Sequence, residues 1–422
     1  MLLFREFTLM IFYFWLIWVL PMTQHPIWGG RVGPLTVFEY LGLASLAYAT
    51  LHILRNKQAP AFLQMPQVCA LFPFYLWATL SMLGSGGSIS PGNSPFVAYT
   101  SSFLLFLITL AVIDSMSRFR RIVLVMIGSY AFASLYVLRE WQTEHARWSS
   151  FRPGWIAGDS NYFSCAALIS VFPALYLATS SRVLWQRLFC AACLLAICPA
   201  LTLCASRGAF VGLAVAAIHS IWHTRRRLRT LFLLSILVIP ASLLLPISPL
   251  RRLVNPEVAE RTSEGAHLEA WRAGLRMIEA HPVTGVGVGR FKEEMRAYAA
   301  PGLDVDTIGH NMFIEIAAEM GIPSALLFFS IFVFDFRGLA KLRKAPQASR
   351  FAKQMAAALS ASLVALLVSG LFISAEYQKT TWFALALAAS LCSPALFRAA
   401  LRRPLDSRAH LPRSADLAVA RN

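Results

Sequence analysis

The chain has 422 residues, of which 57% are hydrophobic and only 14% are charged, and its mean hydropathy is +0.59. Soluble domains carry about 25% charged residues, so a water-soluble globule is excluded, and the excess of apolar residues also excludes a disordered chain. The net charge of +17 comes from short basic clusters between apolar segments. That pattern is typical of membrane orientation rather than of nucleic-acid binding, so the composition predicts a protein embedded in a bilayer.

Apolar segments of about 15 to 25 residues recur along the chain and match a bilayer core roughly 30 Å thick. The sequence shows no internal repeat and no domain linker. We therefore predict an all-α polytopic membrane protein with about twelve transmembrane helices. The predicted spans are 3–21, 34–54, 67–83, 95–114, 120–138, 161–179, 184–203, 208–222, 229–248, 311–335, 354–375 and 380–397.

The distribution of basic residues predicts the orientation of these spans. With a cytoplasmic N terminus, most of the 38 Lys and Arg residues fall in inner loops, as the positive-inside rule requires. Both termini are then cytoplasmic, and the polar clusters face outward. We expect spans one to nine within 1–248, a periplasmic helical loop at 249–309, spans ten to twelve within 310–397, and a basic cytoplasmic tail at 398–422.

The outer segment 249–309 is too long for a simple connection, so we expect it to fold onto the membrane surface. Leu268, Trp271, Leu275 and Ile278 have the spacing of one helical face. This spacing predicts an amphipathic helix whose apolar face is formed by these four side chains.

Two further features of the outer segment follow this helix. The helix is expected to end at His281-Pro282, and a second amphipathic helix is expected near 291–298. Between them, Gly285-Val-Gly-Val-Gly289 has the glycine spacing of a dinucleotide-binding fingerprint, but no strand precedes it. We therefore interpret it as a tight turn.

His310 and Asn311 stand where the outer loop meets the tenth predicted span. With a reference pKa near 6.5, an imidazole accepts a proton at neutral pH, which suits activation of a hydroxyl nucleophile. The alternative is an interfacial or helix-capping histidine. Glu315 and Glu319 share one helical face just beneath it, and buried carboxylates at such a depth are usually paired. We expect them to orient His310 or to meet an arginine, and a water-filled cavity would accommodate them equally well.

Arg207 lies in the short connection Cys204–Gly208 between the seventh and eighth predicted spans. A guanidinium is permanently charged and binds two phosphate oxygens at once, so this position suits a lipid-linked phosphate. The alternative is a single arginine that snorkels to the interface.

A second outer loop carries Arg139 and Arg152 and leads to Asn161 at the start of the sixth predicted span. The loop is neutral overall, so an ordinary solvated loop is an alternative to phosphate binding. Asp159 or Asn161 is expected to cap the sixth span.

The sequence contains no HExxH motif and no P-loop, and its one Cys-x-x-Cys pair, Cys190 and Cys193, lies inside an apolar span. All seven cysteines fall within or at the ends of apolar runs, so we expect them to be small core residues. A mechanism with no metal and no cofactor is expected.

Several stretches, in this order, resemble the bacterial O-antigen ligase and O-antigen polymerase superfamily, and most of all an O-antigen ligase. The match covers roughly the second half of the chain, and its order and spacing make the combination specific. The stretches are Gly158-Asp159-Ser-Asn161, Ser206-Arg207-Gly208, Trp271-Arg-Ala-Gly-Leu-Arg-Met-Ile-Glu-Ala-His281-Pro-Val-Thr-Gly285-Val-Gly287, His310-Asn311-Met-Phe-Ile-Glu315 and Ala318-Glu319-Met-Gly321-Ile-Pro323.

The resemblance implies a glycosyltransferase that moves a saccharide from undecaprenyl pyrophosphate to a hydroxyl group at the periplasmic face of the inner membrane. For a ligase, the acceptor is the lipid A core oligosaccharide. By motif, Arg207 would bind the pyrophosphate and His310 would stand beside the acceptor, with Asn161, Asn311, Glu315 and Glu319 in support.

The chain departs from the family pattern at one position. Members often carry an arginine four residues before the tryptophan of the loop helix, whereas this chain has His267 before Trp271. The further candidates for pyrophosphate contact are Arg272, Arg276, Arg261, Arg139 and Arg152.

Three other functions fit parts of the pattern. A polymerase would use a growing polyprenyl-linked chain as acceptor, and a protein O-oligosaccharyltransferase would use Ser or Thr hydroxyls. A polytopic lipid or saccharide transporter belongs to a different class. Transporters commonly show repeat symmetry and polar groups in the middle of their spans, whereas the polar residues here gather on one face.

Overall fold

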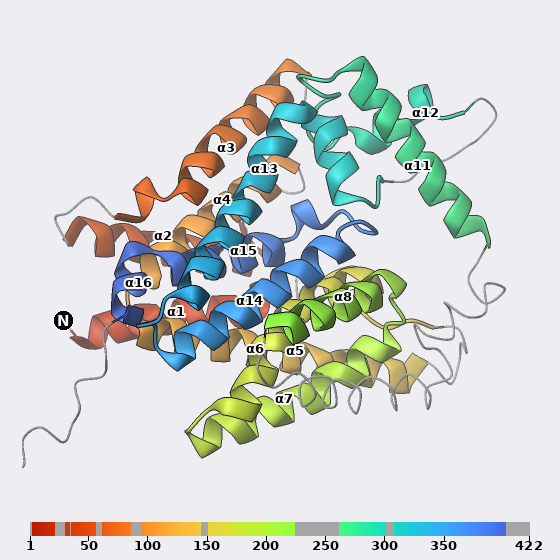
Figure 1. The fold of residues 1–422 in the computed structure, drawn as a ribbon. Coiled ribbons are helices and arrows are strands. Elements are labelled where there is room, and N and C mark those ends of the chain that lie inside the picture. Colours follow the sequence, from red (N-terminus) through yellow and green to blue (C-terminus); the bar gives the residue numbers. More distant parts are fainter. Residues whose placement is uncertain are drawn as a thin grey trace, which may run out of the picture.

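The computed structural model describes residues 2–21, 30–33, 35–55, 61–85, 95–144, 151–223, 261–300 and 308–401. Within these ranges the regular structure is helical (Figure 1), apart from one antiparallel pair of strands with two residues each. The elements are α1 (Leu2–Val19), β1 (Arg31–Val32), β2 (Leu35–Thr36), α2 (Val37–Arg55), η1 (Ala61–Gln64), α3 (Pro66–Gly84), α4 (Pro95–Val112), α5 (Met116–Glu144), η2 (Trp155–Ala157), α6 (Ser160–Ser180), α7 (Leu184–Leu203), α8 (Arg207–His223), α11 (Arg261–Ala280), α12 (Phe291–Tyr298), α13 (Met312–Lys344), α14 (Arg350–Ser369), η4 (Ala375–Tyr377), α15 (Lys379–Cys392) and α16 (Pro394–Leu401).

In the described ranges, eight helices are long and apolar enough to cross a membrane: α2 to α7, α13 and α14. The pair α15 and α16, bent by 51°, makes a ninth if it counts as one span. The chain is therefore a multi-pass helical membrane protein, as its composition predicts. The predicted span 229–248 lies outside the described residues, so the count of about twelve stays a prediction.

Helix α14 stops earlier than its predicted span. The sequence predicts helix up to residue 375, whereas α14 ends at Ser369 with Gly370 as its C-cap. A turn of residues 370–374 follows, and it leads into η4. Apolar side chains continue through this turn, so hydropathy alone does not reveal the end of the helix.

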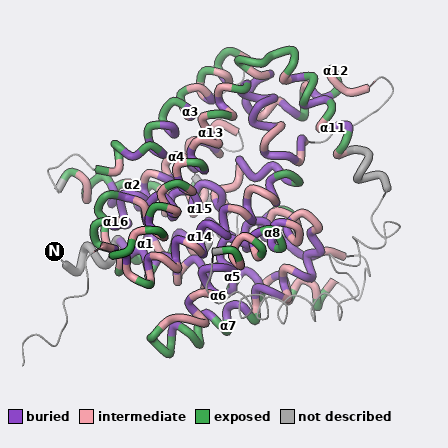
Figure 2. The backbone as a smooth tube through the Cα atoms, viewed as in Figure 1, coloured by how far each residue is buried: buried purple, intermediate pink, exposed green. Residues whose placement is uncertain are grey.

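The centre of the bundle is formed by α13, α14 and α15. Helix α14 packs against α6, α8 and α13, while α13 also packs against α3, and α15 lies against α4. Helix α15 is buried on all sides from Thr380 to Leu391 (Figure 2). A helix that is apolar all round is expected at such a central position.

Helices α11 and α12 lie beside the first turns of α13 (Figure 1) and share a small apolar core with it. The predicted amphipathic helix is present as α11, but its packed face differs from the predicted apolar face: Leu268 and Leu275 are 48% and 51% exposed, and Ala270, Ala273 and Met277 are buried. Small side chains allow α11 to approach α13 closely, and hydrophobic periodicity favours the larger residues and misses this.

Helix α13 is broken at Gly321, where φ is +80°, and Pro323 follows in the next turn. Proline has no amide hydrogen, so the carbonyl of Glu319 has no donor within its own helix. The Val286 and Gly287 amides donate to the carbonyls of Ala318 and Glu319, both at 2.9 Å.

The glycine-rich stretch therefore pairs with the broken helix, and its turn interpretation is confirmed. Gly285, Gly287 and Gly289 all have positive φ. A Cβ atom on Gly285 would lie 2.2 Å from the carbonyl carbon of Glu319, so this approach requires glycine.

Candidate active site

The turn of residues 370–374 joins two segments that are far apart in the sequence. The Met312 amide donates to the carbonyl of Gly370 at 2.8 Å and to that of Ile373 at 3.2 Å. On the other side, the Ser369 hydroxyl donates to the Gly208 carbonyl at 3.4 Å. The start of α8 and the start of α13 thus meet at one turn, which brings the neighbourhoods of Arg207 and His310 together.

Both of these neighbourhoods contain unusual backbone. Among the described residues, the non-glycine positions with positive φ are Ala205 at 49° and His310 at 45°. Such conformations cost about 1–3 kcal/mol each, and they persist where the surrounding structure holds them, often at functional sites. The first precedes Arg207 by two residues, and the second is the candidate base itself.

The imidazole of His310 is half-buried and lies against the ring of His267 from α11, with 4.5 Å between the ring centroids. Burial and the neighbouring His267 lower the pKa of His310 to about 4, whereas the Asp159 carboxylate acts in the opposite direction. His310 is therefore neutral at neutral pH and has a lone pair available to accept a proton. His267 occupies the place where the resemblance leads one to expect an arginine.

Arg152 links the loop before α6 to the turn before α8. Its Nε donates to the Cys204 carbonyl at 2.9 Å, and its Nη2 donates to the Asn161 side-chain oxygen at 2.8 Å. Asp159 caps α6 by accepting from the Asn161 amide at 2.6 Å, which decides between the two expected caps. Two of the sequence candidates, Arg152 and Asn161, thus lie beside the segment that carries Arg207.

Arg272 and Arg276 of α11 both lie on the carboxylate of Glu269. Arg276 contacts the carboxylate of Glu269 at 3.3 Å and the carbonyl of Tyr298 at 2.5 Å, and Arg272 lies 3.7 Å from the same carboxylate. The Ala300 amide and these arginines hold the pKa of Glu269 below its usual value. This arrangement fastens α11 to the end of α12. Arg139 is exposed near the end of α5.

Asn311 is the N-cap of α13, where its side-chain oxygen accepts from the Phe313 and Ile314 amides at 3.0 and 3.2 Å. It is buried, so this sequence candidate has a clear structural role in fixing the direction of the helix that follows His310.

Glu315 and Glu319 are both buried on the face of α13 that points toward η4. Ser374 donates a hydrogen bond to Glu315, and Tyr377 donates one to Glu319. The Phe291 amide also donates to Glu319, at 3.2 Å. In the described residues these hydroxyls and backbone amides take the place of the arginine or His310 that the sequence led us to expect. Sequence reasoning missed both hydroxyl partners, because they follow α14 and belong to no motif.

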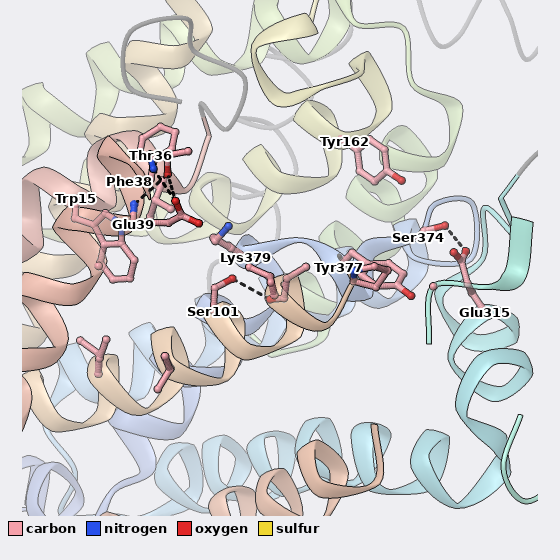
Figure 3. Close-up of a pocket in the computed structure, with 18 of the residues that line it drawn as sticks. Trp15, Thr36, Phe38, Glu39, Ser101, Tyr162, Glu315, Ser374, Tyr377 and Lys379 are labelled. Carbon is pink, nitrogen blue, oxygen red and sulfur yellow. Dashed lines mark hydrogen bonds between the residues drawn. The ribbon is translucent and has the colours of Figure 1, made fainter. Parts of the chain in front are cut away.

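A cavity of about 780 Å³ lies beside these carboxylates (Figure 3). Glu315, Ser374 and Tyr377 lie at one end, and Trp15, Phe38 and Glu39 lie at the other, with Lys379 between them. Its walls come from α1, α2, α4, α13 and the segment around η4, so no single stretch of sequence predicts it.

In the part of the chain that the structure describes, no group of three or more His, Cys, Asp or Glu side chains is arranged to hold a metal ion. The free cysteines are mostly buried, in line with a role in the core.

The fold and the site define a multi-pass membrane protein whose charged and polar side chains converge where several helices begin. The model of the O-antigen ligase family matches residues 191–329, which run from α7 into α13 and include Arg207, α11 and His310. The match confirms the resemblance of the sequence to the O-antigen ligase and polymerase superfamily, whose members act on lipid-linked saccharides. No curated protein matches the chain.

Proposed function

We propose that the chain is an O-antigen ligase. It moves a polysaccharide from undecaprenyl pyrophosphate to a hydroxyl of the lipid A core oligosaccharide, at the periplasmic face of a bacterial inner membrane. The observation that carries this proposal is the meeting of two matched segments at one turn: the start of α8 with Arg207 and the start of α13 with His310.

The arginine side of the site receives the pyrophosphate of the donor. Arg207 and Arg152 are the proposed contacts, because the backbone carbonyl of Cys204 ties Arg152 to the segment that ends at Arg207. Arg272 and Arg276 are weaker candidates, since both lie on the carboxylate of Glu269. Arg139, whose side chain is exposed on the adjoining α5, could make an outer contact with the donor. A guanidinium stabilises the charge that develops on the leaving oxygen without a metal ion.

His310 is the proposed general base. It takes the proton of the acceptor hydroxyl as that oxygen attacks the anomeric carbon, and the bond from this carbon to the pyrophosphate oxygen breaks. The electron pair leaves with undecaprenyl pyrophosphate, and attack from the opposite face inverts the anomeric centre. The negative charge of a bound donor favours the protonated imidazole, so it strengthens a base whose pKa is low in the free protein.

The test is transfer by purified His310→Ala in lipid, with polyprenyl-pyrophosphate glycan and core lipid supplied separately. General-base catalysis is typically worth about 10² to 10⁴ in rate, and we expect a loss of that size with unchanged insertion. His281→Ala is the matched control, because His281 is an exposed histidine of the outer segment that contacts Tyr298. Parental transfer by His310→Ala would remove the histidine from the mechanism.

A further inference from the structure

The 780 Å³ cavity has two chemically different ends (Figure 3). Near the start of α13, its lining includes the carboxylates of Glu315 and Glu319 and the hydroxyls of Ser374 and Tyr377. The opposite end carries apolar side chains of α1, α2 and α4, among them Leu43, which is 52% exposed, beside Thr36 and Glu39 at the start of α2. An occupant that satisfies both ends must itself be amphipathic.

The cavity is long enough for an extended ligand. Residues from Pro95 to Ile108 of α4 line it on one helical face. At 1.5 Å per residue, this stretch extends for about 20 Å along the helix. That distance accommodates a sugar together with a length of hydrocarbon chain, as in a glycolipid.

The polar groups of the cavity suit the hydroxyl groups of a sugar. Its lining carries the three carboxylates Glu39, Glu315 and Glu319 and the two ammonium groups Lys292 and Lys379. Thr36 already donates to Glu39 at the start of α2, and Lys379 points toward that carboxylate (Figure 3). Glu315 and Glu319 accept hydrogen bonds from the hydroxyls of Ser374 and Tyr377. Carboxyl oxygens accept hydrogen bonds from sugar hydroxyls in the same way.

The cavity also borders the segment that carries the candidate base. Ile308 lines it two residues before His310, and Glu315 lines it from the first turn of α13. A hydroxyl held at this end lies on the side of the His310 segment where the carboxylates are. Arg152 and the turn before Arg207 belong to the loops that precede α6 and α8. From this region, the lining of the cavity includes Tyr162 in the first turn of α6.

From these observations we propose that this cavity binds the acceptor glycolipid, with its sugar hydroxyls at Glu315, Glu319 and Tyr377 and its acyl chains along α4. The inference rests on the proposed function, because only that function makes the glycolipid an acceptor. Binding of the glycolipid can be tested without measuring transfer. The donor, whose head carries the pyrophosphate, is assigned to the arginine side.

The experiment measures equilibrium binding to the full chain in lipid nanodiscs, with a core-oligosaccharide glycolipid as one probe and undecaprenyl pyrophosphate as the other. Ser101→Trp places a large side chain on the wall that α4 contributes. We expect it to weaken glycolipid binding about tenfold and to leave undecaprenyl pyrophosphate binding unchanged. Leu76→Trp is the control, since Leu76 is 59% exposed on α3 and lines no part of this cavity.

A milder variant keeps the test decisive if Ser101→Trp fails to fold. Tyr377→Phe removes the hydroxyl at the polar end without changing the volume, and we expect glycolipid binding to weaken about threefold to tenfold. Weaker binding of undecaprenyl pyrophosphate alone would assign the cavity to the donor and overturn the proposal, and so would unchanged binding of both probes.

Binding and transfer separate the two proposals. His310→Ala is expected to bind the glycolipid normally although it transfers nothing. If His310→Ala were fully active while Ser101→Trp lost glycolipid binding, the proposed mechanism would fail and the cavity assignment would stand.

Discussion

The two sides of the α13 start differ in the chemistry of their charged groups. On one side, the guanidinium of Arg152 contacts a backbone carbonyl and an amide oxygen, close to Arg207. On the other side, buried carboxylates accept from the hydroxyls of Ser374 and Tyr377. Cations suit a pyrophosphate and carboxyl groups suit hydroxyl groups, so the difference shows how the proposed donor and acceptor lipids would be told apart by their polar heads.

Among the variants that test this difference between the two sides, the largest loss of transfer is expected at Arg207. Arg207→Lys keeps the positive charge but loses the planar pair of donors, and we expect transfer to fall about 10²-fold together with donor affinity. Transfer kinetics and undecaprenyl pyrophosphate binding measure it. Arg182→Lys, at an exposed arginine between α6 and α7, is the control. Unchanged donor affinity in Arg207→Lys would remove Arg207 from the pyrophosphate site.

The position of Glu319 depends on the glycine turn at Gly285, which pairs with the break in α13. In Gly285→Ala, the new Cβ would meet the Glu319 backbone at 2.2 Å, and the φ of +67° adds strain. We expect a loss of stability of about 1–3 kcal/mol, visible as a lower melting temperature and faster proteolysis of the outer segment.

Gly84→Ala is the matched control for that prediction. A Cβ at Gly84 meets nothing within 4 Å, and the residue lies at the end of α3. We expect no measurable loss of stability. Equal behaviour of the two variants would show that the turn does not need glycine at residue 285.

The smallest effects concern the pH dependence of the base. An imidazole with an ordinary pKa would lose half of its neutral form near pH 6.5, whereas the pKa of His310 is lowered to about 4. Protonation stops a base from working, so we expect kcat/KM to stay level as the pH falls from 7.5 to about 5 and to decline only below that. A decline centred near pH 6.5 would contradict this environment for His310.

In a plot of kcat/KM against pH, the decline at low pH forms an acidic limb. Two variants are expected to shift this limb in opposite directions. His267→Gln removes a neighbour that lowers the pKa of His310, so the limb moves to higher pH. Asp159→Asn removes a charge that raises this pKa and keeps a side chain that can cap α6, so the limb moves to lower pH. Kinetic pH profiles of both variants measure the shifts, and shifts of the same sign would refute the assignment of these neighbours.

The sequence predicted the helical membrane fold because spans need long apolar segments, and their compositional signal is strong. It also predicted the local roles that follow from neighbouring residues, such as the cap at Asp159 and the turn at Gly285. It did not predict the exposure of Leu268 and Leu275, because small residues can form the closer helix contact. The partners of Glu315 and Glu319 were missed for another reason: they come from a turn that forms only where α14 stops.

Because α13 is broken, the segment that carries the glycine turn supplies hydrogen-bond donors to this membrane helix. The carbonyls of Ala318 and Glu319 depend on amides that lie more than thirty residues earlier in the chain. If that segment were deleted or replaced by an unrelated loop, the Ala318 carbonyl would lose this donor and the Glu319 carbonyl would keep the hydroxyl of Ser81 on α3. An unsatisfied backbone group in apolar surroundings costs several kcal/mol. A chimaera that exchanges outer segments between relatives would thus have to transfer the glycine turn and the kinked helix together.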